Sequence, residues 1–438
     1  MKNISHNKQF FIILFCLITY VIGFIFKDYT PTGAKGDFES FTWSVIQSFK
    51  NDLSGSIINF GKFADANYPL FYIFNAYLNP FAYSISSYHI STFFFAIITF
   101  IVFGIILIKK KIHINKLNCF ALASTILILP FFAARSYWGT TASLGWISFV
   151  ISIFYFLKVE ENEKNKIQGD YITIFLFCLF SAITIYIRPS FVFFPIFFTF
   201  LIFLKKYSLY LKITSLVTFF FMSLPGFYLI YEWQGIIARD AREGVVFGNL
   251  IDFVYVVKNL PIISSIFLFY LAPIFIFKIF KGNFIELKKT YLKPFIFFFI
   301  LMSLIYFFGY LEYLNNFTLG GGALLKLNYL IGKEFIMFFI IIASLGFSVI
   351  YTIFKESPER NIPLILSIII IYGFPKYLYQ DYFEPLIFFI ISIGLIESEL
   401  SKFLKKNFLT MTTYYFVFFL LYSLSSYLFK NMQLSNYF

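Results

Sequence analysis

The run Gln9-Phe-Phe-Ile-Ile-Leu-Phe-Cys-Leu-Ile-Thr-Tyr-Val-Ile-Gly-Phe-Ile-Phe26 contains no charged residue. A helix of about 20 apolar residues spans the hydrocarbon core of a bilayer, and this run is close to that length. Lys2 and Lys8 precede the run, and no small-residue cleavage site follows it. We therefore interpret it as a retained membrane span and not as a signal peptide.

The rest of the chain has a similar composition. Its 438 residues are 60% hydrophobic and 13% charged, whereas soluble domains have about 45–50% apolar and about 25% charged residues. This composition excludes a soluble, collagen-like, coiled-coil or disordered protein. Cys16, Cys119 and Cys178 all lie in apolar runs, so they form neither a disulfide framework nor a metal-ligand cluster.

Further apolar runs predict an all-α polytopic membrane protein with about 13 transmembrane helices, within a range of about 11 to 13. We treat the chain as a single integral-membrane domain, 1–438. After the first span, the expected spans lie near 86–108, 117–134, 139–157, 171–187, 189–204, 211–230, 260–277, 294–309, 334–354, 361–378, 383–396 and 408–429.

The short apolar run 68–83 is expected not to cross the membrane. The N-terminus and the basic segment 109–116 should both be cytoplasmic, because Lys and Arg favour that side. Only two spans can then separate them, so 68–83 is predicted to form an interfacial helix inside a long outer loop, 27–85.

The charge distribution agrees with this topology. The expected inner segments hold 22 of the 35 basic residues and 9 of the 22 acidic ones, as the positive-inside rule requires. The chain should therefore have a cytoplasmic N-terminus and an external C-terminus. Its basic residues are scattered over seven loops, so they indicate contact with membrane lipids and no nucleic-acid partner.

The outer loop 27–85 carries the first candidate site residues. A loop of this length usually has a function, and Asp37 and Glu39 lie about ten residues beyond the first span. A carboxylate just above the hydrocarbon boundary can serve as a general base. The simpler interpretation is a solvated loop acid.

Three cations are expected at the outer boundary of later spans: Arg135, Arg188 and Lys376. Ionisable residues at membrane depth indicate function by default, although single side chains can also reach lipid headgroups. Cations beside a base suit a substrate that carries a phosphate in the headgroup plane and an apolar tail in the bilayer.

This order of features resembles the GT-C superfamily of integral-membrane glycosyltransferases, which includes the protein mannosyltransferases and the lipid A aminoarabinose transferase. Asp37 stands where the catalytic Asp of that family would be. The segment Asn67-Tyr68-Pro69-Leu70-Phe71 takes the place of a Pro-Pro-Leu motif, with one Pro and no His. The segment ending in Phe383-Glu384-Pro385 is similar to a Tyr-Phe-Glu-Pro segment of some bacterial members.

The resemblance implies an inverting transferase on the outer face of the membrane. It would move a sugar from a polyprenyl-phosphate donor to a glycan, lipid or protein acceptor. Asp37, with Glu39 beside it, would supply the base, and Arg135, Arg188, Lys376, Tyr68 and Glu384 would bind substrate. No cofactor is implied for certain, although Asp37 and Glu39 leave a divalent cation possible.

Two other functions stay open at this point. An O-antigen or capsule repeat-unit polymerase also has many spans and long outer loops and uses undecaprenyl-pyrophosphate-linked glycans, but such enzymes concentrate their length in later loops. A lipid-linked oligosaccharide flippase or another transporter should show internal repeats and broken spans near the midplane. The ionisable residues here cluster at the outer boundary instead.

Overall fold

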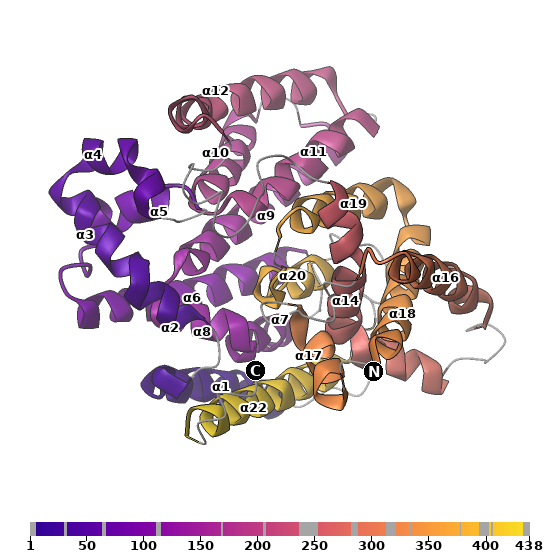
Figure 1. Ribbon diagram of the computed structural model, residues 1–438. Coiled ribbons are helices and arrows are strands. Elements are labelled where there is room, and N and C mark those ends of the chain that lie inside the picture. Colours follow the sequence, from indigo (N-terminus) through magenta and orange to yellow (C-terminus); the bar gives the residue numbers. More distant parts are fainter. Residues whose placement is uncertain are drawn as a thin grey trace. The chain divides into compact units, whose positions relative to one another are not determined.

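The computed structural model describes residues 6–29, 33–63, 67–110, 115–167, 170–204, 207–235, 253–281, 288–311, 321–332, 335–376, 378–393, 403 and 406–431 (Figure 1). These residues form helices and no strands, so the predicted all-α class is confirmed for the described part. The chain divides into two compact units, Met1–Val246 with Tyr415–Tyr437, and Phe247–Tyr414 with Phe438.

The first unit contains long apolar helices and many short helical elements. They are α1 (His6–Ile25), η1 (Lys27–Tyr29), α2 (Ala34–Asp37), η2 (Phe38–Thr42), α3 (Trp43–Asn51), α4 (Leu53–Ile58), η3 (Phe60–Phe63), α5 (Leu70–Ile73), η4 (Phe74–Leu78), α6 (Ile85–Lys109), α7 (Lys116–Ser124), η5 (Thr125–Ile128), α8 (Pro130–Trp138), α9 (Thr141–Lys164), α10 (Tyr171–Ile187), η6 (Pro189–Val192), α11 (Phe193–Leu204) and α12 (Leu209–Trp233). The last helix, α22 (Phe408–Asn431), adds its later part to this unit: Phe416 packs edge-on against Phe15 of α1 at 4.5 Å.

The second unit contains α14 (Phe253–Lys281), η7 (Lys288–Leu292), α16 (Lys293–Phe307), α17 (Gly322–Ile331), α18 (Ile336–Lys355), α19 (Pro358–Gly373), η10 (Gln380–Tyr382) and α20 (Leu386–Ser392). Its helices α14 and α18 approach each other closely at Gly346: a Cβ placed there would lie 1.9 Å from the carbonyl oxygen of Ser264. Only a residue without a side chain fits there. The rings of Phe298 and Phe347, stacked at 4.3 Å, join α16 to α18.

Seven helices in the described ranges are long and apolar enough to cross a bilayer, so the chain is a polytopic membrane protein. They are Asn7–Ile25, Ile85–Lys109, Thr141–Lys164, Leu209–Trp233, Val254–Ile276, Thr290–Phe307 and Ile336–Lys355. Three shorter apolar helices are Tyr171–Ile187, Pro189–Leu204 and Phe408–Leu424. The larger total of about 13 spans stays a prediction.

The expected third span is bent. Lys116–Ile128 and Pro130–Trp138 meet at 70° and count as an eighth span only if taken together. Leu129, between them, is extended, because a residue that precedes proline avoids the helical region. Pro130 then begins α8 at a position where a missing N–H costs nothing. The sequence predicts one span near 117–134; the structure bends it by 70°, and Pro130 is the physical reason.

Short helices fill the loop 27–85. The run 68–83 contains α5 and η4, which together cover nine residues and are too short to cross a bilayer. Its place at the membrane surface stays a prediction. Aromatic packing holds the loop together: the rings of Phe49 and Tyr72 stack at 6.0 Å, and Tyr77 donates a 2.6 Å hydrogen bond to the carbonyl of Phe49.

The first helices run alternately through their unit. Lys27, just after α1, contacts His89 near the start of α6 and Trp138 at the end of α8. At the opposite ends of these segments, Asn115 before α7 contacts Gln9 of α1 at 3.5 Å. This alternation agrees with the expectation that two spans separate the N-terminus from the basic segment 109–116, with the third span following. The cellular side of each end remains a prediction.

Candidate functional site

Asp37 and Arg135, which are 98 residues apart, form an ion pair in the first unit. Nη1 of Arg135 donates to Oδ2 of Asp37. Asp37 ends α2 and leads directly into the π-helical turn η2, while Arg135 projects from the bent helix α8. The Arg135 side chain is 19% exposed and that of Asp37 35% exposed. The pair is thus partly shielded from water but still reachable by a ligand.

One face of α8 gathers further cations. Trp138 follows Arg135 by three residues, so the two side chains are neighbours on the helix surface. Nζ of Lys27 lies 4.9 Å from the centroid of the Trp138 ring, and Nζ of Lys35 lies 5.5 Å from it. Both geometries suit cation–π attraction. The indole Nε1 of Trp138 also donates to the carbonyl of Lys27 at 3.3 Å, which ties α8 to the end of the first span.

His89 holds the Lys27 ammonium from the side of α6. Lys27 Nζ donates to Nδ1 of His89, so the imidazole accepts there and carries its proton on Nε2. In the described part of the chain Nε2 is buried without a hydrogen-bond partner, and the ring lies 4.8 Å from that of Phe38. Burial lowers the pKa of Lys27 to about 8; Asp28 opposes this effect and Lys35 adds to it.

Lys35 differs from Lys27 because carboxylates surround it. Its Nζ donates to Oδ1 of Asp28 at 2.7 Å and lies 3.7 Å from Oε1 of Glu39. The hydrogen bond to Asp28 is the main reason that the pKa of Lys35 is raised. Glu39, the second predicted catalytic acid, therefore contacts Lys35. Among the described residues, no three His, Cys, Asp or Glu side chains gather in a group that could hold a metal ion.

Tyr68 lies in an aromatic stack. Its ring stacks on that of Trp233 at 5.5 Å, and Trp233 stacks on Phe60 at the same distance. Tyr68 also lies 6.1 Å from Tyr186 of α10, and burial raises the pKa of Tyr68 to about 12. These contacts join the loop 27–85 to the end of α12. They do not test the role of Tyr68 in substrate binding, which stays a prediction.

Arg188 ends α10 in an extended conformation, and its backbone N–H donates to the carbonyl of Thr184. Its Cβ lies near Gly145, in the first turns of α9. The side chain is partly exposed. Arg188 thus sits where α10 meets the start of α9, whereas Arg135 is the predicted cation that the structure brings to Asp37.

Lys376 and Glu384 belong to the second unit. Lys376 is exposed. Glu384 is 1% exposed, and its Oε2 accepts a 2.5 Å hydrogen bond from the hydroxyl of Tyr270 in α14. Gln380 donates to the same hydroxyl at 3.0 Å and accepts from the backbone N–H of Ala323 at 2.6 Å. This network ties η10 to α14 and α17; the role of Glu384 in substrate binding stays a prediction.

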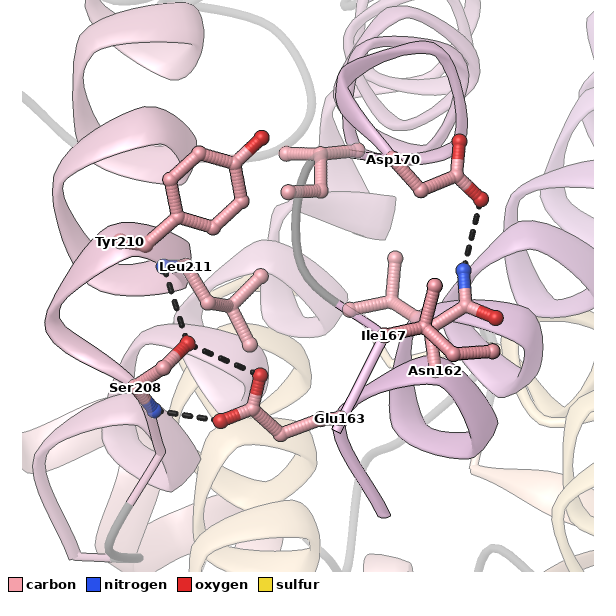
Figure 2. Close-up of a pocket in the computed structure, with 9 residues that line it drawn as sticks. Asn162, Glu163, Ile167, Asp170, Ser208, Tyr210 and Leu211 are labelled. Atoms are coloured by element: carbon pink, nitrogen blue, oxygen red, sulfur yellow. Dashed lines mark hydrogen bonds between the residues drawn. The ribbon is translucent and has the colours of Figure 1, made fainter. Parts of the chain in front are cut away.

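A pocket lies at the opposite end of the first unit, where α9, α10 and α12 meet (Figure 2). Its polar atoms bind one another. Glu163 accepts hydrogen bonds from the backbone and the hydroxyl of Ser208, and Asp170 accepts from Asn162 at 2.6 Å and from the first turn of α10. The Asp170 carboxylate therefore caps α10, and the Glu163 carboxylate ties the end of α9 to the residue before α12.

Sequence reasoning missed Lys27, Lys35, His89 and Trp138. Lys27 could have been identified from the sequence, because it is the first cation after a span and precedes a candidate base by ten positions. His89 lies inside an apolar run, where a lone histidine usually indicates a core position. Its contact with Lys27 depends on the packing of α1 against α6 and α8.

No family model, no curated protein and no solved structure matches this chain.

Proposed function

We propose that this chain is a membrane glycosyltransferase that moves a sugar from a polyprenyl-phosphate donor to an acceptor on the outer face of a bacterial inner membrane. The observation that carries the proposal is the ion pair of Asp37 with Arg135, on the α8 face that also meets Lys27 and Lys35. A carboxylate and several cations at the ends of apolar helices match a reaction with one proton to remove and one phosphate to release.

Asp37 acts as the general base in this mechanism. It takes the proton of an acceptor hydroxyl while the hydroxyl oxygen forms a bond to the anomeric carbon of the sugar. The bond from that carbon to the phosphate oxygen breaks on the opposite face, so the configuration inverts. The electron pair leaves with the lipid phosphate. Arg135 orients the Asp37 carboxylate through its hydrogen bond, as a positioned base requires.

The cations next to Trp138 stabilise the departing phosphate. Charge that develops in a transition state is stabilised best by groups that are already fixed in place. Lys27 is fixed by His89 and by the Trp138 ring, and Lys35 by Asp28. We therefore add Lys27 and Lys35 to the predicted phosphate ligands. Arg188, Lys376, Tyr68 and Glu384 keep their predicted roles in substrate binding.

Turnover by an Asp37→Asn variant tests the proposal. The purified protein in lipid nanodiscs is supplied with polyprenyl-phosphate sugars and acceptor glycans, and the products are measured by mass spectrometry. The substitution keeps the shape and removes the base, so turnover should fall about 10²–10⁴-fold. Asp52→Asn is the matched control. Asp52 lies in the same loop and caps α4 through the N–H of Gly55, a role that Asn fills equally well.

Three results would contradict parts of the proposal. Near-normal turnover by Asp37→Asn would remove Asp37 as the base and direct the search to Glu39. Loss of turnover in Asp52→Asn as well would show that the loop is merely sensitive to substitution. Joining of pyrophosphate-linked glycans, without transfer from any monophosphate-linked sugar, would favour the repeat-unit polymerase.

A further inference from the structure

A tyrosine hydroxyl from α10 bridges the backbone of α12. Tyr186 donates a 2.6 Å hydrogen bond to the carbonyl of Met222 and accepts a 2.9 Å hydrogen bond from the N–H of Gly226. Met222 and Gly226 are four residues apart, so these are the two atoms that face each other across one helical turn. The hydroxyl thus binds the two groups that pair with each other in a regular helix, and so competes with the hydrogen bond that closes this turn.

Pro225 removes a further backbone hydrogen bond from this part of α12. Proline has no N–H, so the carbonyl of Phe221 lacks its donor within the helix. Kinks in helices occur at proline and where a side chain inserts into the hydrogen-bond ladder, and both conditions meet here. Gly226 allows the close approach, because a Cβ there would lie 3.2 Å from the Tyr186 hydroxyl. Residues 222–226, which we call the hinge, are therefore the turn of the continuous helix α12 where bending is least opposed.

The segment beyond the hinge, 226–233, reaches the loop of the candidate site. It ends at Trp233, whose ring stacks between Phe60 and Tyr68 of the loop 27–85. Tyr186 contacts the ring of Tyr68 as well. Most apolar side chains of α12 are exposed, and α12 lies beside α10 at the edge of its unit (Figure 1). Within 226–233 the buried apolar side chains are Leu229 and Trp233, so few packing contacts have to shift or move along when this segment pivots.

We propose that Tyr186 is a positioning residue for the lipid substrate: by bridging Met222 and Gly226 it lets 226–233 pivot and so opens the lipid side of the loop 27–85 to an isoprenoid chain. This inference rests on the proposed function. The segment is about 12 Å long, so a pivot of about 30° moves its tip by about 6 Å, a little more than the diameter of a hydrocarbon chain. Trp233 carries the movement to Tyr68, and through it to the loop that holds Asp37.

Spin-label distances in the full chain, in nanodiscs, test the hinge directly. One label pair joins exposed Tyr231, beyond the hinge, to exposed Ile85 at the start of α6; the control pair joins exposed Leu209 to exposed Ile105 at the other ends of the same helices. Tyr231 lies about 7.5 Å beyond Gly226, so farnesyl phosphate should shift the first distance distribution by up to about 4 Å and leave the control pair unchanged. The Tyr186→Phe variant keeps the ring but loses the bridge, so its first distribution should not respond.

Kinetics separate positioning from stability. Donors with short and long isoprenoid chains are compared in the wild type and in Tyr186→Phe. The variant should raise KM for the long-chain donor about fivefold, the ratio that corresponds to one hydrogen bond, and leave kcat and the short-chain KM unchanged. If Tyr186→Phe does not fold, Gly226→Ala disturbs the same contact from the other side and should have the same effect.

Failure of the hinge and failure of the proposed function give different results. Sugar transfer without any response of the Tyr231–Ile85 distance to farnesyl phosphate would overturn the hinge and leave the function intact. A response without sugar transfer would support the hinge as an isoprenyl-phosphate device and overturn the transferase. An equal shift by farnesol, which lacks the phosphate, would contradict the link between the hinge and the phosphorylated lipid.

Discussion

Substituting both partners of the Asp37–Arg135 pair, singly and together, measures how strongly the protein depends on their contact. Asp37→Asn leaves a guanidinium that is 19% exposed facing a neutral amide, and Arg135→Gln leaves a carboxylate that is 35% exposed. Breaking a fully buried pair costs about 3–5 kcal/mol, whereas exposed pairs contribute about 0.2–1 kcal/mol. Because water reaches Asp37, we expect each single substitution to cost about 1–2 kcal/mol.

The double variant should cost less than the sum of the single ones, with a coupling energy of about 1 kcal/mol. Reversible unfolding in mixed detergent micelles, followed by tryptophan fluorescence, measures all four proteins of the cycle. The variant Arg135→Lys should recover only part of the coupling, since an ammonium offers a point charge and not a planar fork. Additive costs, within about 0.3 kcal/mol, would refute the contact between the two side chains.

Three further predictions concern charge, packing and topology. Burial lowers the pKa of Lys27 to about 8, so above about pH 8 its positive charge is lost and the KM for the donor should rise. The variant Lys27→Arg stays charged and should move that rise beyond pH ~10. A wild-type KM that does not change from pH ~7 to ~9 would contradict this prediction. Gly346→Ala places a Cβ against backbone and should destabilise the protein by about 1–3 kcal/mol in thermal unfolding, whereas Gly36→Ala, with nothing within 4 Å of the added Cβ, should not. The native cysteines are buried, so an impermeant maleimide applied to intact cells should label Ser54→Cys and spare Lys164→Cys; the reverse pattern would invert the topology.

The course of the chain was predictable where charge and length decide it. The distribution of basic residues predicts that 68–83 does not cross the membrane, and its helices α5 and η4 cover fewer residues than a span needs; its place at the membrane surface stays a prediction. Asp37 and Arg135 were identified separately, as ionisable residues at the ends of spans, and the structure joins them. Composition and position along the chain were sufficient to select these two residues, because ionisable groups beside hydrocarbon are rare; their roles in catalysis and substrate binding stay predictions.

Other features depend on packing that periodicity does not encode. The bend before α8 follows from one proline, whereas hydropathy alone predicts a span near 117–134 and says nothing of a bend. Lys27 and His89 meet because three helices pack together, and neither residue carries a local motif. Glu384 lies in a segment similar to a family motif, and nothing in the sequence indicates that its carboxylate accepts a hydrogen bond from Tyr270 in the interior of the second unit.

The order of these residues along the chain has a consequence for biogenesis. Lys27, Asp37, His89, Arg135 and Trp138 all lie in the first third of the sequence, so the cluster is complete early in synthesis. With the expected topology, the loop that carries Asp37 has already been translocated when Arg135 leaves the ribosome. An arginine in an inserting segment is costly, although less so near the end of the span, where Arg135 lies, than at its centre. A carboxylate that is already in place gives the arriving guanidinium a partner, which makes insertion of the bent α7–α8 segment easier.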